Sequence, residues 1–219
     1  MNKIFIKKVL PLSLVTLLAL QVIYFVSEPT ISSAVTASDN VIVTLNVTSG
    51  ITISNGADTT MTPNLGVTSD QAVGSSSWIV KTNNAAGYTL SVKASTSPAL
   101  ADGVVDSFAD YTEAVAGTPD VWGGVAAGTK EFGFSAYGAD TNTTTWGTSA
   151  SCGNTSTGVP AAAQKYKGFS LTDFQIATRN VVTPNAGITT NICFAAQQNA
   201  VYASSGIYTA TVIATAATL

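Results

Sequence analysis

The chain contains no histidine, and this limits the chemistry that its other side chains could perform. A Ser-His-Asp triad and a zinc site of the usual kind both draw on that residue. Two carboxylates can hydrolyse a glycosidic bond without it, and Asp120 and Glu131 lie on either side of Trp122 in the sequence. Sequence spacing alone does not bring those two groups together. We therefore expect a protein that is not an enzyme, with a secreted hydrolase as the alternative.

Oxygen-rich segments that could hold a metal ion occur at two places. Asp102, Asp106 and Asp110 recur every fourth residue, which is the spacing of one face of a helix. Carboxylates on successive helical turns do not surround one ion, so we expect a solvated face. Residues 140–144 have the sequence DTNTT, which lacks the turn glycine and closing glutamate of a calcium loop. We expect no metal and no other cofactor.

The chain has two cysteines, Cys152 and Cys193. An even pair in an exported protein is typically a disulfide. The bond would close a long loop and stabilise the fold by roughly 4 kcal/mol in the chain-entropy model. A pair of free thiols is the alternative. A catalytic thiol is not expected, because no histidine is present to deprotonate it.

Trp122 and Trp146 lie in segments rich in glycine and threonine. Aromatic rings in the exposed loops of a secreted β-protein can stack on sugar rings, and on this hypothesis both tryptophans contact a ligand. The alternative is that they close the ends of the hydrophobic core. The sequence favours the second interpretation and leaves the first open.

The elements that must position these residues follow an N-terminal export segment. Three lysines precede an apolar run over residues 9–26, and small residues fill positions 32–37. That order is typical of a signal peptide spanning residues 1–37. The alternative is an uncleaved N-terminal anchor, because about 18 apolar residues reach the lower limit of a membrane span. In either case residues 38–219 form the domain and are expected outside the cell or on its surface.

Strand periodicity recurs throughout residues 38–219. The pattern predicts an all-β domain, a single antiparallel sandwich of about 8–10 strands that is Ig-like or jelly-roll-like. The turn at residues 83–87 is expected to join two strands as a hairpin. A short amphipathic helix or a folded insertion is expected near residues 99–115. The predicted strands are 41–47 with 51–53, 78–80, 88–92, 131–137, 166–170, 174–178, 187–195 and 206–215.

Charge is sparse, since only 10% of residues are charged and the formal net charge is −3. Such a surface offers no basic stripe for nucleic acid. A membrane contact is expected only through the N-terminal segment, if that segment stays uncleaved. The composition is common in wall-associated and fibrous proteins, so the expected partners are a cell-wall polymer, other surface proteins or further copies of the chain.

Two segments resemble WxL-type bacterial wall-binding domains. Residues 87–92 (GYTLSV) are similar to the family's first motif, with Tyr88 standing where the family has tryptophan. Residues 202–212 are similar to its final strand, in which Gly-x-Tyr precedes alternating threonine and aliphatic residues. Pilin-like secreted sandwiches share that final strand. The resemblance implies a bacterial surface sandwich, with Tyr88 as a residue that contacts the wall ligand.

Two functions are compatible with these observations. The first is a non-enzymatic surface protein with a structural or adhesive role, and a self-assembling surface subunit is one form of it. Residues 41–47 could then act as a strand donated to another subunit, and the alternative for this segment is an ordinary first strand. The second function is a wall- or glycan-binding module of the WxL-like type.

Overall fold

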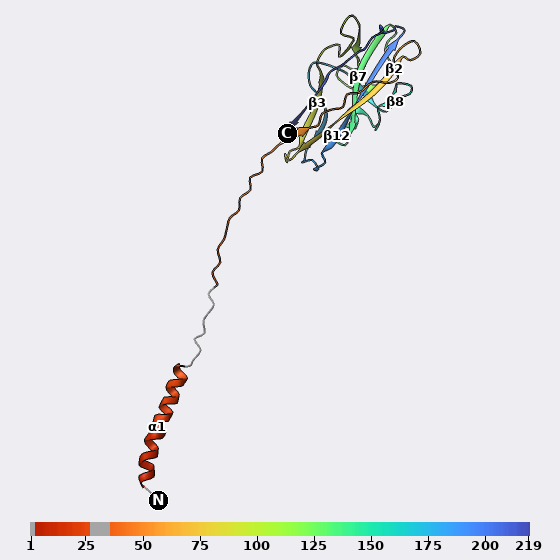
Figure 1. The fold of residues 1–219 in the computed structure, drawn as a ribbon. Helices are drawn as coiled ribbons and strands as arrows, with labels where there is room; N and C mark the ends of the chain where they lie inside the picture. Colours follow the sequence, from red (N-terminus) through yellow and green to blue (C-terminus); the bar gives the residue numbers. More distant parts are fainter. Residues whose placement is uncertain (1–2, 27–35) are drawn as a thin grey trace. The chain divides into compact units, whose positions relative to one another are not determined.

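The computed structural model describes residues 3–26 and 36–219, which fall into two units, Met1–Asn46 and Val47–Leu219. In the first unit the apolar run forms helix α1, Lys3–Val26 (Figure 1). Among the described residues, no helix has the length and apolarity needed to cross a membrane. The small residues 32–35 of the expected cleavage pattern lie outside the described residues.

The second unit, called the body below, is built mainly of β-strands. Its large sheet has the strand order β1-β2-β12-β7-β10-β6, and β5 pairs with β7 and with β4. Within the described body the only parallel pair is β5 with β7. The strands of this sheet are β1 Ile51–Ile53, β2 Gln71–Thr82, β4 Leu100–Ala101, β5 Ser107–Asp110, β6 Asp120–Val121, β7 Thr129–Gly138, β10 Lys165–Gly168 and β12 Ile188–Asn199.

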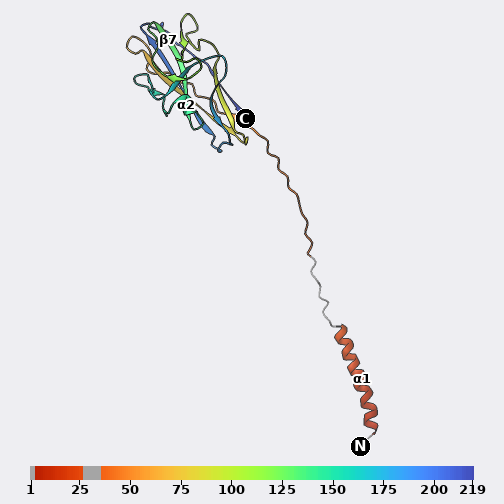
Figure 2. The ribbon, with the colours of Figure 1, turned by 180° about the vertical axis from the view of Figure 1, so that it is seen from behind.

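A second sheet has three antiparallel strands in the order β11-β3-β13. They are β11 Phe174–Arg179, β3 Tyr88–Ala94 and β13 Val212–Thr218. A small hairpin pairs β8, Gly153–Asn154, with β9, Val159–Pro160. The one-turn helix α2, Thr143–Trp146, contacts β7 (Figure 2). The mostly β, antiparallel character predicted from the periodicity is therefore confirmed.

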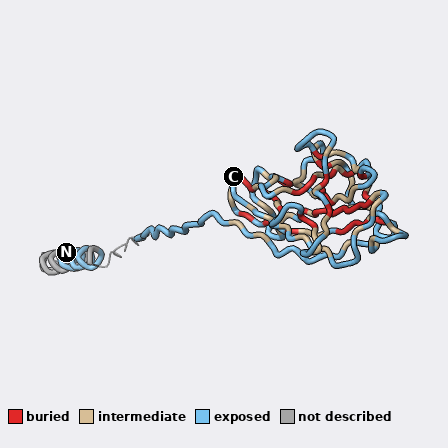
Figure 3. Tube along the Cα trace, turned by 90° about the horizontal axis from the view of Figure 1, so that it is seen from above, coloured by how far each residue is buried: buried red, intermediate tan, exposed pale blue. Residues whose placement is uncertain are grey.

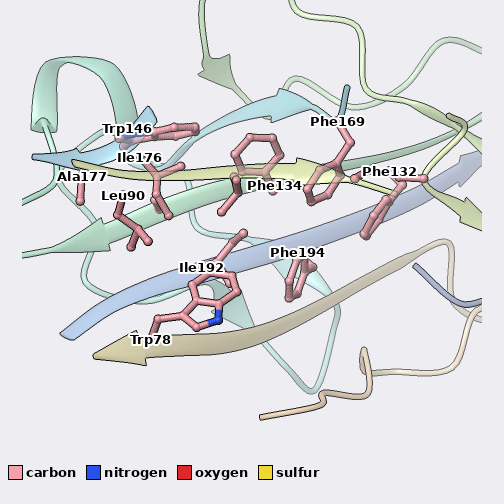
Figure 4. Packing of buried hydrophobic residues seen from close by; sticks show 14 of the residues in the cluster. Trp78, Leu90, Phe132, Phe134, Trp146, Phe169, Ile176, Ala177, Ile192 and Phe194 are labelled. Carbon is pink, nitrogen blue, oxygen red and sulfur yellow. The ribbon is translucent and has the colours of Figure 1, made fainter. Parts of the chain in front are cut away.

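One hydrophobic core draws side chains from both sheets (Figure 4). Strand β3 buries every second residue, as expected for a strand with one face on a core. Strands β2, β7 and β12 contribute from the large sheet, and buried segments run through the interior of the body (Figure 3). The aromatic members include Phe132, Phe134 and Phe194.

The large sheet is also covered on its other face. Ile192 and Phe194 of β12 belong to the shared core, whereas Cys193 and Ala195 between and beside them belong to a second cluster. Successive side chains of a strand point to opposite faces. The second cluster is therefore formed on the face turned away from the shared core, where Tyr166 packs against it.

Of the two alternatives near residues 99–115, the helix is not formed, and the segment is a folded insertion that contains the hairpin β4–β5. The Asp102 side chain accepts the backbone N–H groups of Val104, Val105 and Asp106, which closes the turn. Asp110 accepts a hydrogen bond from the backbone N–H of Ala99. Aspartate side chains readily bond to nearby backbone groups, and these bonds compete with helix formation. The spacing of four residues indicates a helix face but carries no information about such bonds.

Two further strand predictions were wrong. Residues 83–87 do not join a hairpin, because β2 and β3 belong to different sheets and have different partners. Residues 41–47 form no strand in the structure. Their alternating sequence permits a strand, but a strand also requires a partner for its backbone hydrogen bonds. The strand predicted over residues 206–215 begins only at Val212, as β13.

Candidate functional site

Tyr88, expected to contact a ligand, is fully buried in β3. Its hydroxyl donates to Asp140 Oδ2 at 2.8 Å, and Arg179 Nη1 donates to Asp140 Oδ1 at 3.2 Å. Burial, and then the Asp140 carboxylate, raise the pKa of Tyr88 well above its ordinary value. A ring with no exposed surface cannot stack on a sugar, so in this structure Tyr88 serves the core and the ligand-contact prediction is corrected.

The glycine before Tyr88 has a local backbone role. Gly87 has φ +87°, a conformation that side chains with a Cβ rarely adopt. A Cβ at this position would also collide with the backbone carbonyl of Arg179. The Gly-Tyr pair that carries the family resemblance is therefore explained here by close packing of the chain against the end of β11.

Trp146 is also buried, with 1% of its surface exposed. Asn142 caps α2 by accepting the backbone N–H of Thr144, and this positions the indole against Phe134 and Phe174 at ring-centroid distances of 5.4 and 5.7 Å. Trp146 is therefore part of the hydrophobic core, and its ring is not exposed to contact a ligand.

Trp122 keeps part of its surface exposed, unlike Tyr88 and Trp146. One face stacks on Tyr111 with ring centroids 4.4 Å apart. The indole N–H donates to Gln197 Oε1 at 2.8 Å, and the ring meets Tyr166 edge-on. Trp122 thus lies over the second cluster and remains the one predicted ligand-contact residue that a solute can reach.

The two carboxylates that flank Trp122 in sequence are both occupied by hydrogen bonds. Asp120 accepts the Tyr111 hydroxyl at 2.8 Å and the backbone N–H of Ala114 at 2.6 Å. Glu131 accepts the backbone N–H of Thr112 at 3.1 Å. These bonds hold the loop that follows β5 and give both carboxylates a structural role.

The disulfide prediction is confirmed, because Cys152 and Cys193 are bonded with their Cα atoms 5.1 Å apart. The bond fastens the loop containing β8 and β9 to the second-cluster face of β12. Tyr166 adds a hydrogen bond from its hydroxyl to the carbonyl of Cys152 at 2.9 Å. Such a bond persists in an oxidising environment.

Within residues 3–26 and 36–219, no group of three or more potential ligands among His, Cys, Asp and Glu is placed to hold a metal. The three aspartates of residues 102–110 bind separate partners: Asp102 and Asp110 make the backbone contacts described above, and Asp106 contacts Lys130, Ser204 and Tyr208. Asp140 is engaged by Tyr88 and Arg179. Residues 140–144 therefore act as a polar loop and a helix cap.

The outer edge of β13 is unpaired among the described strands. Strand β13 pairs with β3 on one side and, among the described strands, with none on the other. Its residues alternate between half-buried and exposed positions. An edge of this kind presents unpaired N–H and C=O groups to any strand that approaches.

Residues 41–47, called the N-terminal run below, are uncharged and exposed. The run has the sequence VIVTLNV, and its five large apolar side chains are 76% to 90% exposed. No strand pairs with it in the structure. Exposed apolar groups gathered in this way are typical of surfaces that contact another molecule.

In comparisons with known proteins, no family model, curated protein or solved structure matches this chain.

Proposed function

We propose that this protein is a non-enzymatic structural subunit of a bacterial cell surface, with a β-sandwich body that associates with further copies of itself. The single observation that carries this proposal is the N-terminal run, five exposed apolar side chains with no strand partner. Burial of apolar surface contributes about 25 cal/mol per Å². Covering this run in an assembly would therefore favour association.

Three observations support the setting of this function. The shared core of the two sheets is what a β-sandwich requires. The disulfide fits an oxidising, extracytoplasmic compartment. The basic start and apolar run that precede the body are typical of export.

Sedimentation tests the proposal. The protein is recovered after export, its N-terminus is read by mass spectrometry, and it is centrifuged over a concentration series without cell walls. We expect concentration-dependent assemblies. A chain that remains monomeric at every concentration and never pellets would contradict a self-associating function.

A wall- or glycan-binding module is the second candidate, and Trp122 is the observation that favours it. Its partly exposed ring, stacked on Tyr111, resembles a platform for a sugar. The test is pelleting with purified walls, compared with a tube without walls. If Trp122→Ala abolishes wall-dependent pelleting while the fold is kept, binding replaces self-association as the primary function.

A further inference from the structure

We infer that the open edge of β13 accepts the N-terminal run of a second copy of this chain as an added strand. The inference rests on the proposed function and names the surface that would carry it. Two properties of β13 and two of the run lead to it.

The inward face of β13 is incompletely covered. In the neighbouring strand β3, the inward residues Leu90, Val92 and Ala94 are 0% to 2% exposed. The corresponding residues of β13 are Val212, Ala214 and Ala216, which pack against the same core but are only half-buried. The core thus extends to β13, which contacts β1 of the large sheet but pairs with no described strand on its outer side. An added strand would cover more of these half-buried residues.

The edge of β13 also lacks the usual protection against strand pairing. Natural edges are blunted by charge, proline, bulges or short length. Strand β11, the opposite edge of this sheet, carries Arg179 and a register shift between Gln175 and Ala177. In the large sheet, β1 and β6 are three and two residues long. Strand β13 is seven residues long, VIATAAT, with no charge, proline or register shift.

The N-terminal run matches this edge in length and pattern. Both segments have seven residues. Val43 and Leu45 would lie with the inward face, beside the small, half-buried side chains of Ala214 and Ala216. Thr44 would lie with the outward face, beside polar and small residues. Pairing supplies the backbone hydrogen bonds that both segments lack.

The occupant is a second copy because the residues that join the run to its own body are already engaged. Asn83 donates from its side-chain amide to the carbonyl of Thr48 at 2.8 Å and accepts the N–H of Gly50 at 2.7 Å. Strand β1 follows at once and pairs with β2. For the run to reach its own β13, the chain would have to reverse within residues 48–50 and break both bonds to Asn83.

After one run has been donated, the pair of copies still has one free run and one free edge. Two copies can exchange runs reciprocally and close a dimer, or further copies can add to form larger rings or open filaments, according to the rotation between copies. The inferred contact is therefore compatible with a closed dimer and with larger assemblies.

Two blocked variants of the exported chain test the inference. Ala214→Lys places a charge on the inward edge of β13 and leaves the run intact. The double variant Val43→Asp/Leu45→Asp spoils the apolar face of the run and leaves β13 intact. We expect each alone to need a roughly tenfold or greater concentration for assembly in analytical ultracentrifugation, equivalent to at least about 1.4 kcal/mol.

The decisive measurement is an equimolar mixture of the two variants. One supplies a working run and the other a working edge, so the mixture should form a heterodimer and nothing larger. Matched controls keep the same charges elsewhere: Gln175→Lys on the β11 edge, and Thr44→Asp/Asn46→Asp on the other face of the run. Both controls should assemble like the unmodified chain. Disulfide content and thermal unfolding establish that every variant is folded.

The outcomes separate the inference from the function on which it rests. If the unmodified chain does not assemble, the proposed function fails. If it assembles and Ala214→Lys assembles equally well, the function stands and the β13 edge is excluded. If Val43→Asp/Leu45→Asp still dimerises, two β13 edges pair with each other and the inference is overturned. A mixture without heterodimer overturns it as well.

Discussion

Tyr208 donates a 2.6 Å hydrogen bond from its hydroxyl to Asp106 Oδ2, and this bond fastens the chain that leads into β13 to the hairpin β4–β5. The same carboxylate accepts the backbone N–H of Ser204 at 2.8 Å and forms an ion pair with Lys130 of β7. One side chain thus joins three stretches that are far apart in sequence. The position of β13 depends on this junction.

Acid should weaken that junction. The Lys130 ammonium first, and then the Tyr208 hydroxyl, hold the pKa of Asp106 well below its ordinary value. A lowered pKa in the folded state gives stability that is present above the ordinary aspartate pKa, about 4, and is lost as the pH falls below it. We expect the free energy of unfolding, measured in urea, to decrease from pH 5 to pH 2 (about the range of that titration). Asp106→Asn should be less stable at pH 7 and show a shallower decrease.

Alkali should destabilise the body through its buried phenols. Burial is the main cause that raises the pKa of Tyr208 to about 12 and the pKa values of Tyr88, Tyr111 and Tyr166 above the ordinary value. A raised pKa gives stability that is full below about pH 10 and is lost as the pH rises above it. We expect the melting temperature to fall above that pH.

The alkaline effect can be assigned with paired substitutions. Tyr88→Phe should reduce the loss of stability above about pH 10, because it removes one buried phenol that must ionise on unfolding. Tyr202→Phe is the matched control, since Tyr202 is exposed. Equal pH profiles for Tyr88→Phe and the unmodified protein would be incompatible with this cause.

The disulfide should contribute a measurable share of stability. Cys152 and Cys193 are separated by 41 residues, so the chain-entropy model predicts about 4 kcal/mol from closing that loop. Replacing both cysteines with serine should lower the free energy of unfolding by up to that amount. Reduction of the unmodified chain should raise its mass by about 2 Da. A mass that is unchanged on reduction would disprove the bond.

Gly87 should be intolerant of a side chain for two separate reasons. Gly87→Ala combines a positive φ with a collision against the carbonyl of Arg179, and we expect a loss of about 2 kcal/mol or more. Gly103→Ala is the matched control, because Gly103 has φ +78° but nothing lies within 4 Å of the added Cβ. It should cost about 1 kcal/mol. Equal losses in chemical denaturation would exclude the collision as the cause.

Much of the local structure was predictable from neighbouring residues alone. Alternation over residues 88–92 and 131–137 identified β3 and β7, since one buried face imposes a period of two on the sequence. The pairing of Cys152 with Cys193 followed from their number. The spacing of Asp102, Asp106 and Asp110 did not distinguish a helix from a turn near residues 99–115, because aspartate at that spacing suits a helix face and also suits turns.

The roles of single aromatic residues were harder to predict from the sequence. Trp122 and Trp146 lie in similar segments rich in glycine and threonine, yet Trp146, the last residue of α2, is buried and Trp122 reaches the surface. Burial depends on which distant residues pack against a ring. For Trp146 these are Phe134 and Phe174, and no local pattern identifies them.

The sequence by itself determined the β character, the disulfide and the exclusion of histidine chemistry. These properties depend on residue type and on local periodicity. Only the tertiary structure decided that residues 83–87 pass between sheets and that, among the described residues, neither the N-terminal run nor the outer edge of β13 has a strand partner. Strand pairing joins residues far apart in the chain, and two alternating segments such as 41–47 and 88–92 look alike until the partners of each are known.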